Sequence, residues 1–315
     1  MQWRFIAVRL ARLVVTLFVS SFVIFSSLYL SPGNPIATLS GGRSLSPQAI
    51  ATLQERFHLN DPFLTRYVRW LAGVLHGNFG ISISLRSEVS SLIAARISTT
   101  LVLVVYASVL ILVVGIGLGI LGGLKTGWVD TGVLTATAIS AAVPAFVTAI
   151  GLLMLFVATL GWFPGFGDGD GFTGTLRHLT LPAIALALSS LAIVARITRS
   201  AIRTELRSEH VVTAVSRGIR PSAILRRHVL RNAAIPIVTV SGVTIASMFA
   251  VSAVVERAFT INGLGAYLVK AATSKDFAVV QGISLVIVVV FVVLNALVDV
   301  MYALLDPRSR GGRSS

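Results

Sequence analysis

Six long apolar runs dominate the chain. A helix of about 20 apolar residues, rising 1.5 Å per residue, crosses the roughly 30 Å hydrocarbon core of a bilayer. The runs therefore predict an all-α integral membrane protein, one transmembrane domain over residues 1–315. Its six spans are expected at about residues 9–30, 97–124, 131–160, 179–200, 232–256 and 277–305. Pro144 falls inside the third run, and we expect that helix to continue, because neighbouring helices can satisfy the carbonyl that a proline frees.

Residues 31–96 form the longest connection between two runs, on the outer side. Proline behind a capping residue marks two helix starts in it, at Ser46-Pro47 and at Asp61-Pro62. After the second start, apolar residues recur at helical spacing at Phe63, Tyr67, Trp70, Leu71 and Val74, with Arg66 and Arg69 off that face. Such a helix fits either the membrane surface or the sides of the protein's own spans, and periodicity does not separate the two.

Charge indicates how the spans are oriented. Hydrophobic residues are 55% of the 315 and charged residues 12%, below the about 25% of soluble domains. With the N-terminus inside, the cytoplasmic segments hold sixteen Lys and Arg against four acids, and the outer segments ten against seven. Both termini are therefore expected in the cytoplasm. The basic residues behind the net charge of +14 flank spans instead of gathering on a soluble module, which argues against a nucleic-acid binder.

Residues for catalysis are largely absent. The chain has no cysteine, its five histidines lack metal-binding spacing, and no P-loop motif occurs. We therefore expect no enzymatic activity, metal or cofactor on this chain, and any ATP hydrolysis on another polypeptide. Asp299 is the one candidate for a coupling carboxylate inside a span, and we expect it to pair with a loop arginine. An ion-coupled secondary transporter is disfavoured on this ground and stays an alternative.

The connection between the fourth and fifth spans, residues 203–231, is strongly basic. Nine arginines and two acids lie between Arg196 and Arg231. A short helix is expected from near Ser208 to Gly218, with Val211, Val212 and Val215 on one face, and a second from Pro221, with Ile224, Leu225 and Val229 as its apolar stripe. This pattern predicts a docking surface for a cytoplasmic partner. The alternative is that the arginines only fix topology and contact anionic lipid.

The same segment resembles a family motif. Val212-Thr213-Ala214-Val215-Ser216-Arg217-Gly218-Ile219, followed by Leu225-Arg226-Arg227-His228-Val229-Leu230-Arg231-Asn232-Ala233-Ala234-Ile235-Pro236, is similar to the EAA loop of ABC-importer permeases of the dipeptide/oligopeptide branch. Further similar segments, in the same order, are Leu30-Ser31-Pro32-Gly33-Asn34-Pro35, Gly77-Asn78-Phe79-Gly80, Leu181-Pro182-Ala183, Val255-Glu256-Arg257-Ala258-Phe259, Gly263-Leu264-Gly265 and Asp306-Pro307-Arg308. The resemblance covers nearly the whole chain.

This resemblance implies the type I ABC importer permease fold in the bacterial cytoplasmic membrane. The long outer loop is similar to that of the B-type subunit. The implied partners are a C-type permease subunit, two cytoplasmic ATPase subunits that bind ATP and Mg, and an extracytoplasmic substrate-binding protein that delivers a peptide. The implied coupling residues are Glu209, Val211, Val212, Ala214, Val215, Arg217 and Gly218. The chain departs from the usual pattern at Val215, at Ser216, and at Asn262 in place of a proline.

A translocation pathway is harder to place. The fifth span carries a small and polar stripe, Ser241, Thr244, Met248 and Ser252, and we expect Glu256 and Phe259 near the outer mouth. The stripe suits either a pathway lining or close packing between helices. Peptide is the expected substrate. Permeases for nickel chelates or other small solutes share this architecture and stay an alternative.

Overall fold

The computed structural model describes residues 2–29, 46–48 and 61–305, and all statements below concern these residues. The helices are α1 (Gln2–Tyr29), α4 (Phe63–Leu75), α5 (Val89–Leu110), α6 (Ile116–Leu124), α7 (Trp128–Ala142), α8 (Ala145–Leu152), α9 (Gly171–Leu206), α10 (Glu209–Ser216), α11 (Pro221–Ile224), α12 (Leu230–Ala258), α13 (Leu264–Thr273) and α14 (Phe277–Leu305). Three π-helical segments, Ile111–Gly115, Leu153–Thr159 and Leu225–Val229, join α5 to α6, extend α8 and join α11 to α12. The helix expected after Ser46-Pro47 lies mostly outside the described residues.

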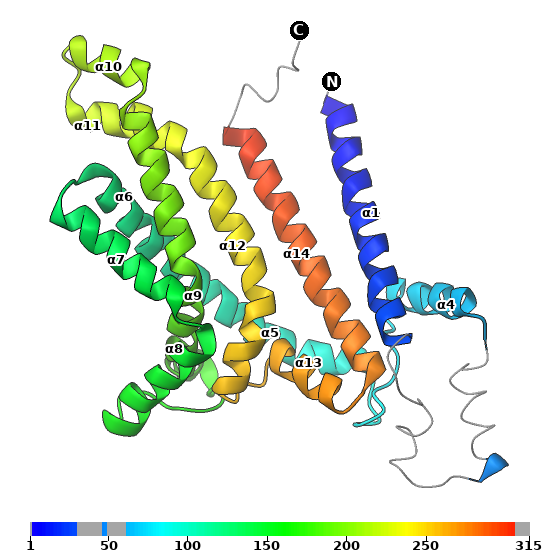
Figure 1. Cartoon of the computed structure of the whole chain (residues 1–315). Coiled ribbons are helices and arrows are strands. Elements are labelled where there is room, and N and C mark those ends of the chain that lie inside the picture. The colour runs from blue at the N-terminus through cyan, green and yellow to red at the C-terminus, as the bar shows by residue number, and fades with distance from the viewer. Residues whose placement is uncertain (1, 30–45, 49–60, 306–315) are drawn as a thin grey trace.

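Five of these helical stretches are long and apolar enough to cross a membrane. They are Ala7–Ser27, Val89–Leu124, Gly171–Leu206, Pro221–Ala258 and Phe277–Met301, and the bent pair α7 and α8 makes a sixth candidate. The start of α1, the end of α14 and the short helix α10 all lie at one end of the bundle, with α4, α8 and α13 at the other (Figure 1). The predicted all-α membrane fold is confirmed.

The third span is not continuous, and the prediction of an unbroken helix through Pro144 is wrong. Val143 has extended backbone angles, φ −94° and ψ 118°, and α8 starts again after Pro144. The two halves are bent by 98°. Proline lacks an N–H group and disfavours helical geometry in the residue before it, so the helix ends here. The outer half of this segment therefore lies across the bundle rather than along it.

The fourth and fifth spans are longer than the sequence predicted. Helix α9 begins at Gly171 instead of near residue 179, so it includes His178, whose ring nitrogen Nδ1 lies 2.9 Å from the Gly174 carbonyl oxygen one turn earlier. The helix expected from Pro221 is not a separate element. It continues through the π-helical turn into α12, so a single helical stretch runs from Pro221 to Ala258.

Helix α9 forms the centre of the bundle, contacting α5, α6, α7, α8 and α12. Glycines on α6 allow the closest of these contacts. A Cβ atom added at Gly119 would lie 2.7 Å from the Ala195 carbonyl oxygen, and one at Gly123 would lie 2.7 Å from the Ile202 side chain. Small residues let helix backbones approach in a membrane, where dispersion contacts replace the hydrophobic effect. Thr198, on the facing side of α9, is fully buried.

Two buried carboxylates hold the outer end of the molecule together around α13. Glu256, at the end of α12, accepts hydrogen bonds from Thr100 Oγ1 and the Ala266 N–H, both at 2.8 Å. Asp276, before α14, accepts from Ser82 Oγ at 2.6 Å and from the Ser84 N–H at 3.0 Å. Each is at most 1% exposed. These bonds tie α5, α12, α13 and α14 into one platform.

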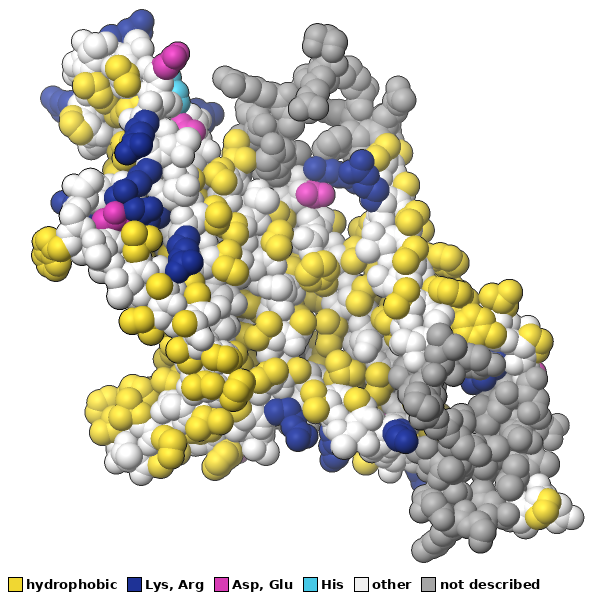
Figure 2. All heavy atoms as spheres, in the orientation of Figure 1, with side chains coloured by type: hydrophobic (Ala, Val, Ile, Leu, Met, Phe, Trp, Pro, Cys, Tyr) yellow, Lys and Arg dark blue, Asp and Glu magenta, His cyan; other side chains and the backbone are white. Residues whose placement is uncertain are grey.

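Asp299 does not pair with a loop arginine as predicted. Its carboxylate lies 3.9 Å from the Arg9 guanidinium on α1. The basic loop packs at the far side of α9, whereas α1 lies beside α14 and supplies the nearer cation (Figure 1). Figure 2 shows the Lys and Arg side chains gathered chiefly at the end that carries α10, with a smaller group at the opposite end and apolar side chains between.

Candidate coupling site and translocation pathway

The connection between α9 and α12 folds as a helical hairpin that projects from the bundle (Figure 1). Helix α10 begins after Ser208, an N-cap residue in extended conformation, and Glu209 in its first turn complements the positive end of the helix dipole. The helix ends at Ser216, and Gly218 then adopts a left-handed conformation with φ +70°. Glycine enters this conformation without the steric penalty that other residues carry, so the chain reverses here before Pro221 starts α11.

The valines of α10 do not share one face, which corrects the predicted three-valine surface. Val211 and Ala214 are 5% exposed and pack with Ile202, Ile224 and Val229 from the neighbouring helices. Val212 and Val215 point the other way and are each 61% exposed. Residues 211 and 214 therefore anchor α10 to the protein, whereas residues 212 and 215 form an apolar surface that nothing in the described chain covers.

Polar residues surround this apolar surface. Glu209, Arg217 and Gly218 are exposed, so of the seven predicted coupling residues only Val211 and Ala214 are buried. The arginines that stand exposed around the hairpin without an acidic partner among the described residues are Arg207, Arg217, Arg220, Arg226, Arg227 and Arg231. The hairpin therefore combines an apolar centre with a cationic rim.

A polar junction that the sequence did not reveal fixes the base of α10. Asn232, at the start of α12, donates a hydrogen bond at 3.2 Å to Glu205 at the end of α9. The His210 ring lies 3.3 Å from the Asn232 amide nitrogen and 3.2 Å from the Ser208 hydroxyl. Glu205, His210 and Asn232 come from α9, α10 and α12. The junction therefore links the orientation of α10 to both spans that flank it.

An ion cluster below the hairpin was also missed. Arg199 on α9 forms two bonds with Asp130 at the start of α7, Nε to Oδ1 at 2.5 Å and Nη2 to Oδ2 at 2.8 Å. Arg203 reaches the same carboxylate at 2.8 Å and donates to the Gly122 carbonyl at the end of α6. Two of the nine arginines are therefore structural, not free for a partner. Asp130 gave no signal in the sequence because its partners lie about 70 residues away.

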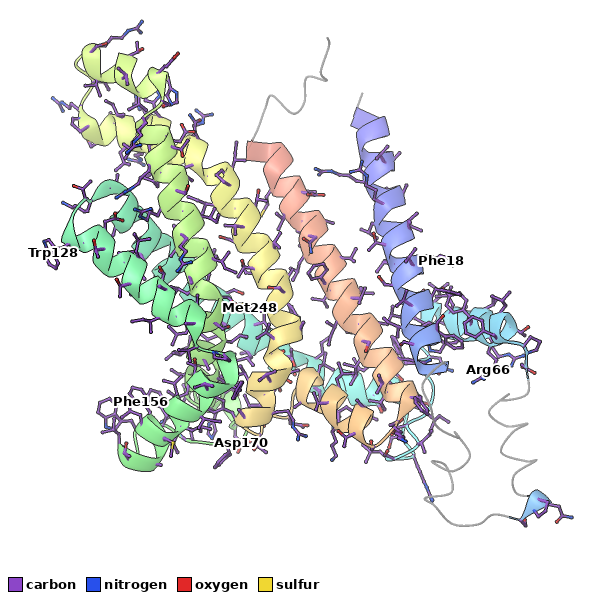
Figure 3. All side chains as sticks on the ribbon, viewed as in Figure 1. Phe18, Arg66, Trp128, Phe156, Asp170 and Met248 are labelled. Atoms are coloured by element: carbon purple, nitrogen blue, oxygen red, sulfur yellow. The ribbon has the colours of Figure 1, made fainter. Side chains whose placement is uncertain are left out.

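The structure buries the predicted pathway stripe inside the subunit. Ser241, Thr244, Met248 and Ser252 are at most 6% exposed, and Met248 packs among α5, α9 and α12 (Figure 3). Glu256 and Phe259 are also buried, the carboxylate in the outer platform and the ring in the main core. All six side chains are buried within this chain. Burial of the stripe favours the alternative interpretation, close packing between helices.

A second stripe of α12, on its opposite side, is exposed instead. It consists of Pro236, Thr239, Val243, Ser247, Ala250, Val254 and Arg257. The hydroxyls of Thr239 and Ser247 bond carbonyls of their own helix, at 2.9 and 2.7 Å, as expected for such residues in a membrane helix. This stripe is the surface of α12 that remains for a solute or for another subunit.

Comparisons with known proteins place the chain in a family. Residues 2–104 match the N-terminal part, and residues 115–311 the main part, of the binding-protein-dependent transport system inner membrane components. The chain belongs to this family. It is therefore a non-enzymatic, multi-pass permease component of an ABC transporter in the inner membrane, and membership implies ATPase and binding-protein partners. No cofactor is expected on a permease component of this family.

Individual relatives align along their full lengths. A putative peptide transport system permease protein of Brucella abortus is 35% identical over 306 residues, 96% of this chain and 97% of that protein. The oligopeptide transport system permease protein OppB of Salmonella typhimurium is 33% identical over 310 residues, covering 98% and 99%. The inward-facing MetNI methionine ABC transporter has a similar fold, with a TM-score of 0.55 at 16% identity, covering 68% of this chain and 96% of that one.

Proposed function

We propose that this chain is the B-type permease subunit of an ATP-driven peptide importer. It would form half of the pathway with a C-type permease subunit, above two ATPase subunits, and receive a peptide from the binding protein outside. Relatives named as peptide, dipeptide and oligopeptide permeases align over 95% or more of the chain, which supports peptide as the substrate class.

One observation carries the coupling role. Helix α10 presents Val212 and Val215 outward, while Val211 and Ala214 of the same helix are locked into the protein. A partner that moves α10 must therefore also move α9 and α12, because the buried face, the polar junction and the short loops leave the helix little freedom to slide alone. In this proposal, an apolar groove of the ATPase receives the two valines and acidic groups there pair with the surrounding arginines.

The test is uptake of labelled peptide into vesicles that contain the complete complex. We expect uptake to require ATP and the binding protein. The double variant Val212→Asp/Val215→Asp should fold and insert normally, since both side chains are exposed, and should lose most uptake because the ATPase no longer docks on α10. Ser222→Asp introduces a negative charge at an exposed position of the neighbouring helix α11, and it is the control for each of the single variants Val212→Asp and Val215→Asp. Normal uptake by the double variant would contradict the coupling role, and uptake of a nickel chelate instead of peptide would contradict the substrate class.

A further inference from the structure

Helix α4 packs on a part of α1 that belongs inside the membrane. The Tyr67 hydroxyl lies 2.8 Å from Ser21 Oγ, and the Tyr67 ring contacts those of Phe18 and Phe22 at centroid distances of 6.0 and 5.3 Å. Figure 3 shows Phe18 on α1 beside α4. The apolar span of α1 ends at Ser27. Six residues of helix separate Ser21 from that end, which is about 9 Å along the axis. Helix α4 therefore lies at the depth of the outer leaflet, not beyond it.

The surface of α4 divides into three strips. The first, with Phe63, Tyr67 and Trp70, packs on α1. The second is apolar and open, with Leu64 64% exposed, Val68 63% and Leu75 78%. The third is polar and carries Thr65, Arg66, Arg69 and His76. At 100° per residue the three strips are centred about 120° apart around the helix, so the polar strip is separated from the apolar one.

We propose that α4 is an interfacial helix whose strip of Leu64, Val68 and Leu75 contacts the acyl chains of the outer leaflet. Three observations favour lipid over a protein partner. The contact depth of about 9 Å matches the 5–10 Å at which interfacial helices lie. The arginines are separated from the apolar strip, as required when one side faces headgroups and the other acyl chains. The neighbouring residues of α1, among them Val15, Val19 and Val23, are more than half exposed and purely apolar, as for a lipid-facing surface.

The proposal has a structural consequence for the outer side. The side chains of Phe63, Tyr67 and Trp70 pack α4 against α1. Contact with lipid would hold the two helices at a fixed depth in the outer leaflet. This role does not depend on which solute the transporter carries.

The test measures which medium quenches fluorescent probes on α4. Because the chain has no native cysteine, the single-cysteine variants Val68→Cys, Leu75→Cys and Thr65→Cys each carry one labelling site on this subunit, and the complex with the original chain measures labelling of the partner subunits. The labelled complete complex is placed in lipid nanodiscs, and quenching by lipids spin-labelled near the headgroup end of the acyl chain is compared with quenching by aqueous iodide. We expect lipid to quench probes at residues 68 and 75 several-fold more than iodide, and the reverse at residue 65.

Two results would overturn the proposal. Iodide quenching at residues 68 and 75 equal to that at residue 65 would place the apolar strip in water. Protection of residues 68 and 75 from both quenchers would show that protein covers the strip. Repeating the measurement with and without the binding protein identifies that cover if it appears. Because Val68 and Leu75 lie off the face that packs on α1, neither substitution removes the contacts that hold α4 in place.

Discussion

At the scale of single residues, backbone geometry at Gly218 gives the clearest requirement for one amino acid. Its φ of +70° is costly for residues with a Cβ atom, yet a Cβ added there would meet no atom within 4 Å. The constraint is therefore conformational and not one of space. A β-branched residue in this conformation costs roughly 1–2 kcal/mol or more, whereas asparagine tolerates it comparatively well.

We expect Gly218→Val to leave insertion and assembly intact and to reduce ATP-driven uptake several-fold, because the turn that orients α10 would be displaced. Gly218→Asn should retain most uptake. Uptake per ATP hydrolysed in reconstituted vesicles measures the effect. Equal uptake by the valine variant and the original chain would show that this turn does not set the position of α10.

A second prediction concerns the buried carboxylate of Glu256. It accepts bonds from Thr100 and Ala266, and no cation neutralises it among the described residues. In Glu256→Gln one oxygen becomes an amide N–H₂ group facing a donor, and an unsatisfied buried polar group costs about 1–3 kcal/mol. We expect a lower thermal unfolding midpoint for the purified complex. Glu88→Gln, at an exposed carboxylate, is the control and should unfold at the original temperature.

At the scale of helices, the contact between α6 and α9 depends on which glycines face it. Gly119 and Gly117 are two residues apart on one helix, but only Gly119 meets α9, and a Cβ at Gly117 would contact nothing within 4 Å. Gly119→Val should therefore destabilise the protein by about 1–3 kcal/mol through overpacking, and Gly117→Val should be nearly neutral. Thermal unfolding in detergent distinguishes the two. Similar midpoints would mean that α6 can shift away from α9 at little cost.

The two sides of α12 make a fourth prediction. If the exposed stripe faces the pathway, cysteines at Val243 and Ser247 should react with polar thiol reagents added from outside, at rates that change when ATP is bound. Cysteines at Thr244 and Met248, on the buried side of the same turns, should react slowly in both states. Equal reactivity on both sides would indicate that α12 rotates or separates from α9 during transport.

At the scale of the whole molecule, the sequence predicted what depends on local pattern. Apolar runs are long enough to reveal spans whatever surrounds them, and Gly218 and Pro221 signal a turn by their own backbone preferences. Which side chains of a helix are buried depends on contacts between helices, and the sequence did not predict it. Helical spacing could not tell the inward Val211 from the outward Val215, because both lie near one face and only Ile202 and Val229 on other helices decide which is covered.

The local sequence pattern also does not reveal where a helix breaks or which distant residues bond to each other. Pro144 and Pro182 both lie in apolar runs, yet the chain bends by 98° at the first and α9 passes through the second. Proline weakens a helix at either place, and the packing of the surrounding helices decides whether it breaks. The stripe of α12 shows the same limit, since small polar residues suit a pathway and a tight helix contact equally.

The cluster of Asp130, Arg199 and Arg203 joins three helices at the cytoplasmic end, and it lies on the route from α10 into the bundle through α9. Its carboxylate is 15% exposed and bonded by both guanidiniums. We expect Asp130→Asn to lower the thermal midpoint and to raise the ATP hydrolysed per solute transported, because α9 could then move without α6 and α7. Arg199→Gln should likewise lower the thermal midpoint and raise the ATP hydrolysed per solute transported.

Asp130→Asn and Arg199→Gln test one interaction. The double variant should therefore change the thermal midpoint and the ATP hydrolysed per solute little more than either single variant does, as for residues that act as a pair. Arg196→Gln is the matched control. It removes the same charge one turn earlier on α9, from an exposed side chain with no acidic partner among the described residues, and should change neither measurement. Additive losses in the double variant would show that Asp130 and Arg199 act separately. In that case the movement of α10 would have to reach the outer platform through α12 alone, whose helix runs unbroken from Pro221 to Glu256.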